Sequence, residues 1–203
     1  MDRAAGIGLG VGALSLVGLL ASELRGRPAA RAALKTTCSL GFVAVALASG
    51  GSGRYGALVL AGLALSVVGD VLLLSQAKKV FLAGLVAFLL AHVAYAAAFA
   101  PLSSRTLGAL LLVTAAVSGI LAWLWPHLGE MRVPVLAYCA VIGTMVWLAL
   151  GVPSTLVRAG ALLFFVSDLL VARGRFVRAG KVNQLVGWPL YYAGQYLLAL
   201  SVG

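Results

Sequence analysis

The sequence predicts an all-α integral membrane protein, a polytopic bundle of about eight transmembrane helices. The first observation is composition: apolar residues make up 63% of the 203 residues and charged residues only 10%, against about 25% charged in soluble domains. Such a chain cannot cover an aqueous surface with polar groups, and it is too apolar to be disordered. The second is length, because a hydrocarbon core of about 30 Å needs roughly 20 mostly apolar helical residues, and the uncharged stretches reach that length.

The first predicted span covers residues 5–22 and follows Arg3. It is longer than the apolar region of roughly 7–15 residues in a signal peptide, so we interpret it as a transmembrane helix. Its closely spaced glycines would let a neighbouring helix approach. The later spans are predicted at 32–49, 55–75, 80–100, 106–125, 133–151, 155–172 and 184–202. Because the connections are short, we expect one membrane domain over residues 1–203.

The Lys and Arg residues in the connections predict the orientation. Connections after the first, third, fifth and seventh spans hold Arg25, Arg27, Arg31, Lys78, Lys79, Arg132, Arg173, Arg175, Arg178 and Lys181. The opposite side holds only Arg3, Arg54, Arg105 and Arg158. Both termini are therefore predicted outside the cytoplasm, in a bacterial-type plasma membrane. The net charge of +10 is mostly this topology signal, with some attraction to anionic lipids. A nucleic-acid partner is not expected, because it would need a basic patch on a polar face.

Three ionisable residues interrupt the predicted spans: Lys35, Asp70 and Asp168. Each costs about 2.5–3.5 kcal/mol to insert at a helix centre. At about 1.5 Å per residue, all three lie roughly 5–8 Å below the cytoplasmic boundary. The other three acids fall in the termini and connections. We therefore predict a pocket that opens to the cytoplasmic face and contains both intramembrane aspartates.

Further polar residues are expected at this pocket, some at the same depth and some deeper. Ser66 and Asp70 are four residues apart and share a helix face. Other interpretations stay open: Lys35 could form a purely structural ion pair or extend to the interface, and His92 could simply join two helices. The candidate substrate-binding residues are Lys35, Ser66, His92, Tyr95, Tyr138, Ser167, Tyr191 and Gln195.

A faint internal symmetry relates the two acids. Residues 66–73 (SVVGDVLL) and 163–170 (LFFVSDLL) each place Asp before two apolar residues or more, on helices of equal direction. A parallel 4+4 repeat of this kind would bring the two helices together at one site.

Four motifs in this chain resemble those of the lysoplasmalogenase (YhhN-like) family. Residues 66–73 look like its S-x-x-G-D-x-L-L signature, and residues 84–95 are similar to its G-L-x-x-F-x-x-A-H-x-x-Y. Residues 160–168 resemble G-A-x-L-F-x-x-S-D, and residues 191–195 resemble Y-x-x-x-Q. The motifs follow the family's order, and the likeness covers about residues 30–200. One departure is Thr36, because the family usually has Pro after the Lys of the second helix.

The resemblance implies a hydrolase that cleaves the vinyl ether bond of lysoplasmalogens, releasing a fatty aldehyde and a glycerophospho-base. Vinyl ethers are cleaved by protonation on carbon, which requires a protonated carboxyl group and a carboxylate that stabilises the resulting cation. Asp70 and Asp168 are the predicted catalytic pair, with the two roles unassigned. If Lys35 neutralises one of them, the other is expected to keep its proton. Lys35 and the cytoplasmic arginines could hold the lipid phosphate.

Other classes of function remain open at this point. A proton-coupled small-solute transporter would also use intramembrane Asp and Lys, and a non-catalytic lipid-binding protein would share the apolar composition. A zinc-dependent amidase resembling the alkaline ceramidases is disfavoured, because zinc usually has three protein ligands and His92 is the one histidine within a span. The isolated Cys38 and Cys139 add no metal site. We expect no cofactor and no metal; the expected partners are an ether lysolipid and the bilayer.

Overall fold

The computed structural model describes residues 3–75 and 77–203, and over these residues it is all-helical, without a β-strand. Short turns of other helix types occur at Trp125–His127, Gly129–Met131 and Arg173–Val177. The predicted fold class is confirmed. The eight α-helices are α1 (Arg3–Leu24), α2 (Pro28–Ala48), α3 (Gly53–Leu72), α4 (Lys78–Phe99), α5 (Leu107–Leu124), α6 (Arg132–Leu150), α7 (Thr155–Ala172) and α8 (Lys181–Leu200).

Seven of the described helices, α1 to α7, are long and apolar enough to cross a membrane. They indicate an integral membrane protein. The eighth predicted span corresponds to α8, which has the length of a span but carries several polar residues. Among these, Asn183 and Gln195 are buried within the bundle. These two amide side chains of α8 therefore face neighbouring helices, whereas Lys181 at its start is exposed. Which end of the bundle faces the cytoplasm stays a prediction.

The helix ends differ from the predicted ones by a few residues. The predicted boundaries were placed where charged side chains begin, but a helix continues through such residues as soon as it leaves the apolar layer. Accordingly, α2 begins at Pro28 and includes Arg31, with Pro in the first turn, where its missing N–H costs no hydrogen bond. Similarly, α8 begins at Lys181. By contrast, α3 is shorter than predicted: it ends at Leu72, three residues before the predicted end.

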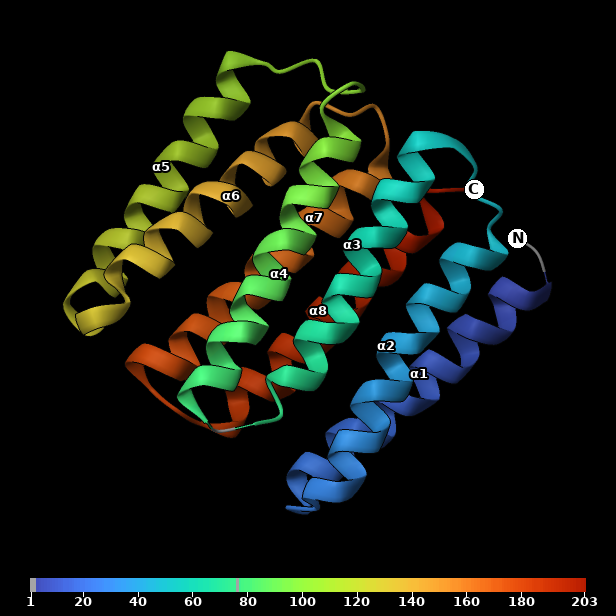
Figure 1. Cartoon of the computed structure of the whole chain (residues 1–203), viewed down its shortest axis with the longest axis vertical. Helices are drawn as coiled ribbons and strands as arrows, with labels where there is room; N and C mark the ends of the chain where they lie inside the picture. Colours follow the sequence, from blue (N-terminus) through green and yellow to red (C-terminus); the bar gives the residue numbers. More distant parts are fainter. Residues whose placement is uncertain (1–2, 76) are drawn as a thin grey trace.

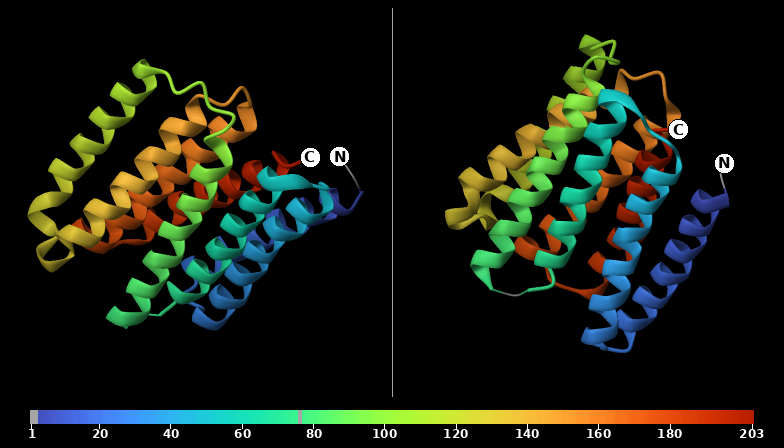
Figure 2. Two further views of the ribbon diagram at one scale, coloured as in Figure 1. Left: turned by 45° about the horizontal axis from the view of Figure 1, so that its top comes forward. Right: turned by 45° about the vertical axis from the view of Figure 1, so that its right-hand side comes forward.

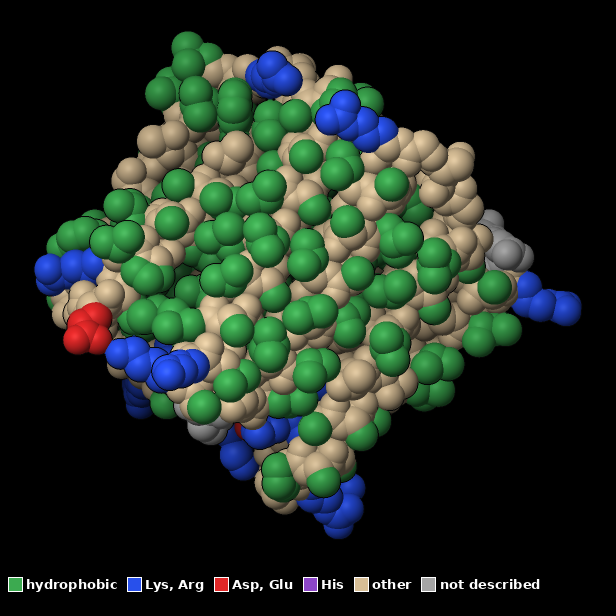
Figure 3. Space-filling view, in the orientation of Figure 1, with side chains coloured by type: hydrophobic (Ala, Val, Ile, Leu, Met, Phe, Trp, Pro, Cys, Tyr) green, Lys and Arg blue, Asp and Glu red, His purple; other side chains and the backbone are tan. Residues whose placement is uncertain are grey.

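The helices form antiparallel neighbours, with both described chain ends at the same end of the bundle (Figure 1). Helices α3 and α4 pack along each other, as do α7 and α8, and α2 contacts both α3 and α8. The α1–α2 pair lies at one side of the bundle and α5–α6 at the other, an arrangement that persists in the rotated views (Figure 2). On the face drawn in Figure 3, Lys and Arg lie near opposite ends and hydrophobic side chains cover the band between them.

Glycine sets the separation of α7, which carries Asp168, from α8, which carries Tyr191. A Cβ added at Gly160 of α7 would lie 3.0 Å from the carbonyl oxygen of Gly194 in α8. A Cβ at Gly194 would lie 2.9 Å from the oxygen of Gly160. The two backbones thus touch, which is typical of membrane helices with small interfacial residues. Gly69, next to Asp70, instead makes room for the Phe88 ring of α4.

Candidate active site

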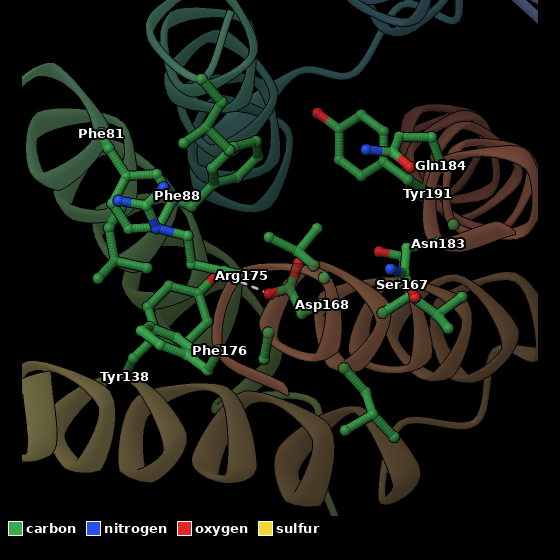
Figure 4. Close-up of a pocket in the computed structure, with 18 of the residues that line it drawn as sticks. Phe81, Phe88, Tyr138, Ser167, Asp168, Arg175, Phe176, Asn183, Gln184 and Tyr191 are labelled. Atoms are coloured by element: carbon green, nitrogen blue, oxygen red, sulfur yellow. Dashed lines mark hydrogen bonds between the residues drawn. The ribbon is translucent and has the colours of Figure 1, made fainter. Parts of the chain in front are cut away.

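A cavity of about 510 Å³ lies among the helices at the end of the bundle formed by the α3–α4 and α7–α8 connections (Figure 4). Residues of α2 through α8 line it, and both intramembrane aspartates are among them. Apolar residues of α5 and α6, such as Ile120, Leu124 and Ile142, form one part of the wall. The charged and amide-bearing residues of the wall are Arg31, Lys35, Asp70, Asp168, Arg175, Asn183 and Gln184.

Asp70 is fully engaged by groups from α2 and α8. Its Oδ1 lies 2.7 Å from the ammonium nitrogen of Lys35. Its Oδ2 accepts hydrogen bonds from the Ser39 hydroxyl at 2.6 Å and the Tyr191 hydroxyl at 2.7 Å. Asp70 is 2% exposed and Lys35 6%. A buried ion pair is tolerated when further hydrogen bonds satisfy its remaining atoms, and this one meets that condition. Asp70 is therefore held as a carboxylate in a fixed position.

The surroundings of Asp168 are different. The Tyr138 hydroxyl donates to Oδ2 at 2.5 Å, as the dashed line in Figure 4 marks, and Nε2 of His92 lies 3.6 Å from the same oxygen. Among the described residues, no Lys or Arg forms a salt bridge with Asp168. Its side chain is 17% exposed, against 3% for Asp70. Asp168 is thus the more accessible acid, and it lacks a full positive charge to balance it.

His92 lies behind Asp168 and is completely buried. Its Nδ1 is 2.7 Å from the carbonyl oxygen of Phe88, one turn earlier on α4. Its ring stacks on Phe164 of α7, with the ring centroids 4.4 Å apart. The edge of Tyr138 approaches the same ring. These contacts fix the orientation of the imidazole and direct Nε2 toward Asp168.

A second buried network lies deeper in the bundle. Tyr95 of α4 donates to Oε1 of Gln195 at 2.7 Å, and Nε2 of Gln195 donates to Ser66 of α3 at 3.2 Å. Ser66 in turn donates to the carbonyl oxygen of Gly62. The network satisfies the amide of Gln195 and joins three helices. It does not line the cavity.

The structure brings most of the predicted site residues into one region but divides them into groups. Lys35 contacts Asp70 and not Asp168. Its ammonium pairs with the Asp70 carboxylate and also donates to the backbone oxygen of Asp70 at 3.1 Å. Ser167 donates to the carbonyl oxygen of Phe164 within its own helix. The predicted residues on the cavity wall are Lys35, Asp70, Tyr138, Ser167, Asp168 and Tyr191. Those behind the wall are Ser66, His92, Tyr95 and Gln195.

Several residues of this region were not among the predicted site residues. Ser39 contacts Asp70, and its one sequence signal was its position one helical turn after Lys35. Tyr192 donates to the carbonyl oxygen of Lys35 at 3.1 Å, and nothing in its sequence position distinguishes it from a packing aromatic. At the cavity mouth, Arg175 lies over the Phe81 ring at 4.2 Å and Arg31 pairs with Glu23 at 3.2 Å. The sequence placed both among the cytoplasmic arginines that could hold the lipid phosphate, but it could not show that these two reach the cavity wall.

No group of three or more His, Cys, Asp and Glu side chains that could hold a metal ion occurs in the described part of the chain. The cavity wall itself offers carboxyl, phenol, ammonium and guanidinium groups, and the imidazole of His92 lies directly behind Asp168. A carboxyl group without a cationic partner and a carboxylate with one share a single cavity, and such a pair can give and take protons.

Residues 30–202 of the chain match the YhhN family. The lysoplasmalogenase of Mycobacterium tuberculosis (strain CDC 1551 / Oshkosh) is 32% identical over 188 residues, covering 87% of this chain and 72% of that protein. Human lysoplasmalogenase TMEM86B is 36% identical over 171 residues, covering 83% of this chain and 72% of that protein. Human lysoplasmalogenase TMEM86A is 36% identical over 157 residues, covering 70% and 64%. No solved structure matches the chain.

Proposed function

The chain belongs to the YhhN family, and we propose that it hydrolyses the vinyl ether bond of lysoplasmalogen-type lysolipids, releasing a fatty aldehyde and a glycerophospho-base. The names of the relatives support the substrate class. One observation carries the chemistry: among the residues that the structure describes, Asp168 reaches the cavity without a Lys or Arg partner, while Asp70 on the same wall is paired with Lys35. Acid catalysis of this reaction needs both kinds of carboxyl group.

Asp168 is the proposed proton donor. A carboxyl group in a membrane span, balanced by no full positive charge, is favoured in its neutral form, because charge is costly in a low dielectric. Its exposed fraction of 17% gives it access to a ligand in the cavity. Tyr138 holds it in place through Oδ2, which orients the carboxyl group toward the substrate. General acid catalysis of this kind contributes about 10²- to 10⁴-fold to a rate.

The proposed reaction consumes one water molecule. Asp168 donates its proton to the vinyl carbon that is not attached to oxygen, and the electron pair of the C=C bond forms the new C–H bond. This leaves an oxocarbenium ion. Water adds to the cationic carbon and loses a proton to the Asp168 carboxylate. The resulting hemiacetal then breaks its C–O bond to glycerol: its hydroxyl loses a proton, the glycerol oxygen gains one, and the aldehyde leaves.

Asp70 has a different proposed role. Its carboxylate lies on the same cavity wall and is kept ionised by Lys35, so it supplies a fixed negative charge where the cation develops. Because Lys35 is committed to Asp70 and Arg31 is paired with Glu23, the lipid phosphate is assigned to Arg175, which lines the cavity and forms no salt bridge among the described residues. The apolar wall formed by α5 and α6 suits the hydrocarbon chain, which the bilayer supplies.

The experiment is aldehyde release from a lysoplasmalogen by the protein purified in detergent. The control substrates are the saturated alkyl ether and the acyl ester with the same headgroup and chain length. Neither has a vinyl ether carbon to protonate, so neither is expected to release aldehyde by this route. Asp70→Asn and Asp168→Asn are each expected to be nearly inactive, and a chelator is expected to leave the rate unchanged. Turnover retained in either variant removes that aspartate from the mechanism.

A further inference from the structure

The imidazole of His92 has one proton whose position is fixed by geometry. Nδ1 lies 2.7 Å from the carbonyl oxygen of Phe88, and a carbonyl oxygen can only accept, so Nδ1 carries the hydrogen. Nε2 is buried and has no hydrogen-bond partner in the described structure, although Oδ2 of Asp168 lies 3.6 Å away. In a neutral imidazole, Nε2 then carries a lone pair and no hydrogen. A lone pair and a carboxylate repel each other, so this arrangement requires a proton between them.

We propose that Asp168 carries this proton and shares it with Nε2 of His92, which makes His92 a positioning residue that keeps Asp168 in its acid form. The inference rests on the proposed function for its catalytic meaning, but not for its geometry. With the proton on Oδ2, Asp168 donates to Nε2 while the same oxygen accepts from Tyr138. A closing of the 3.6 Å separation by less than 1 Å completes this hydrogen bond.

The neighbours of the pair favour the neutral form over an imidazolium–carboxylate pair. The groups that face the His92 ring are the Phe88 carbonyl on α4, the Tyr138 ring on α6, and Phe164 with Asp168 on α7. None of them except Asp168 carries charge. Separating a proton from Asp168 to His92 would therefore create two charges in an apolar layer for one poorly formed contact. Sharing it as O–H···N creates none.

His92 also explains how the acid is restored within a buried site. To protonate carbon, the O–H of Asp168 turns from Nε2 toward the cavity and gives up its proton. The carboxylate then faces the lone pair of Nε2, an unfavourable contact. Proton transfer from the attacking water to Asp168 removes that repulsion and re-forms the shared hydrogen bond. His92 thus drives Asp168 back to its acid form without itself contacting the substrate, in agreement with its complete burial.

The test uses infrared spectroscopy on the substrate-free protein in detergent, following the C=O stretch of protonated carboxyl groups across pH. Wild-type protein is expected to show a band that Asp168→Asn removes. In His92→Asn, whose amide can still donate to the Phe88 carbonyl but lacks Nε2, the band is expected to disappear about one pH unit lower. His92→Phe, which keeps a ring against Phe164 but has no acceptor at the position of Nε2, provides the same measurement should the Asn variant not fold. His127→Asn, in the α5–α6 connection, is the matched control.

Kinetics provide the second measurement. In His92→Asn, kcat is expected to fall with KM unchanged, and the alkaline limb of the pH–rate profile is expected to move to lower pH together with the infrared band. A lower kcat with both pH dependences unmoved would show a merely structural role and overturn the inference, as would a wild-type spectrum without a band that Asp168→Asn removes. Absence of aldehyde release with the band and its shift intact would instead overturn the proposed function alone.

Discussion

The Asp70 and Asp168 regions use the same side chain in two ways. Both aspartates lie near the ends of helices that run in the same direction, and both reach one cavity. Asp70 is surrounded by an ammonium and two hydroxyl groups, whereas Asp168 has one phenol and a buried imidazole. The number of donors around each carboxyl group, not its depth, separates a fixed carboxylate from an acid that can give up a proton.

The largest expected effects come from removing each acid in turn. Asp168→Asn should lower aldehyde release by about 10²- to 10⁴-fold while leaving thermal stability nearly unchanged, because no full charge loses its partner. Asp70→Asn should lose both activity and stability, because Lys35 stays buried without a counter-ion. Thermal denaturation in detergent, measured beside the activity assay, separates the two. Equal losses of stability would abolish the distinction between the regions.

Lys35 provides the next test. Replacing it with Met leaves the Asp70 carboxylate buried without its cation, which should destabilise the fold by about 3–5 kcal/mol. The double variant Lys35→Met/Asp70→Asn should recover much of this stability, because the uncompensated charge is gone. Denaturation of the two single variants and the double variant gives the interaction free energy between Lys35 and Asp70. Purely additive losses would mean that the ion pair contributes little.

The two tyrosines allow a finer comparison. Tyr191→Phe removes a hydrogen bond to an ionised carboxylate, worth about 1.5–3 kcal/mol, whereas Tyr138→Phe removes one to a neutral carboxyl group, worth about 0.5–1.5 kcal/mol. The stability loss should therefore be larger for Tyr191→Phe. Because the substitutions are chemically identical, each serves as the control for the other. The reverse order would indicate that Asp168, not Asp70, is the ionised acid.

The smallest effect is expected at the exposed pair Lys78–Glu130, whose charged atoms are 3.0 Å apart. The hydrogen bond from Lys78, with its charge, lowers the pKa of Glu130. Any contribution of the Lys78–Glu130 pair to the stability of the fold is therefore present above the ordinary pKa of glutamate. It is lost as the pH falls through the lowered pKa of Glu130. Because both side chains are in solvent, Glu130→Gln should leave the denaturation temperature unchanged at neutral pH. A clear decrease would show that the loops, and not only the buried clusters, hold the bundle together.

The sequence predicted the helices and the two acids for the same reason: in an apolar chain, each charged residue is conspicuous. It could not assign Lys35 to one aspartate, because that depends on how α2 is rotated and on a hydrogen bond to the backbone of Asp70. Ser39 was missed because a serine hydroxyl within an apolar helix is common and usually bonds within its own helix. Tyr192 was missed because a tyrosine in a membrane helix is commonly a packing or interface aromatic. The eighth predicted span is interrupted by polar residues: α8 is not among the seven described helices apolar enough to cross a membrane, and two of its amide side chains, Asn183 and Gln195, are buried.

The contact between Lys35 and the backbone oxygen of Asp70 also determines how α3 ends. The last carbonyl groups of a helix have no partner within it, and they carry the negative end of the helix dipole. Asp70 lies in that last turn, and its carbonyl accepts a hydrogen bond from the Lys35 ammonium. Lys35 therefore acts as a cap supplied by a neighbouring helix. It allows α3 to stop inside the bundle, and Asp70 to lie at a helix end within reach of the cavity, without an unsatisfied carbonyl group at that position.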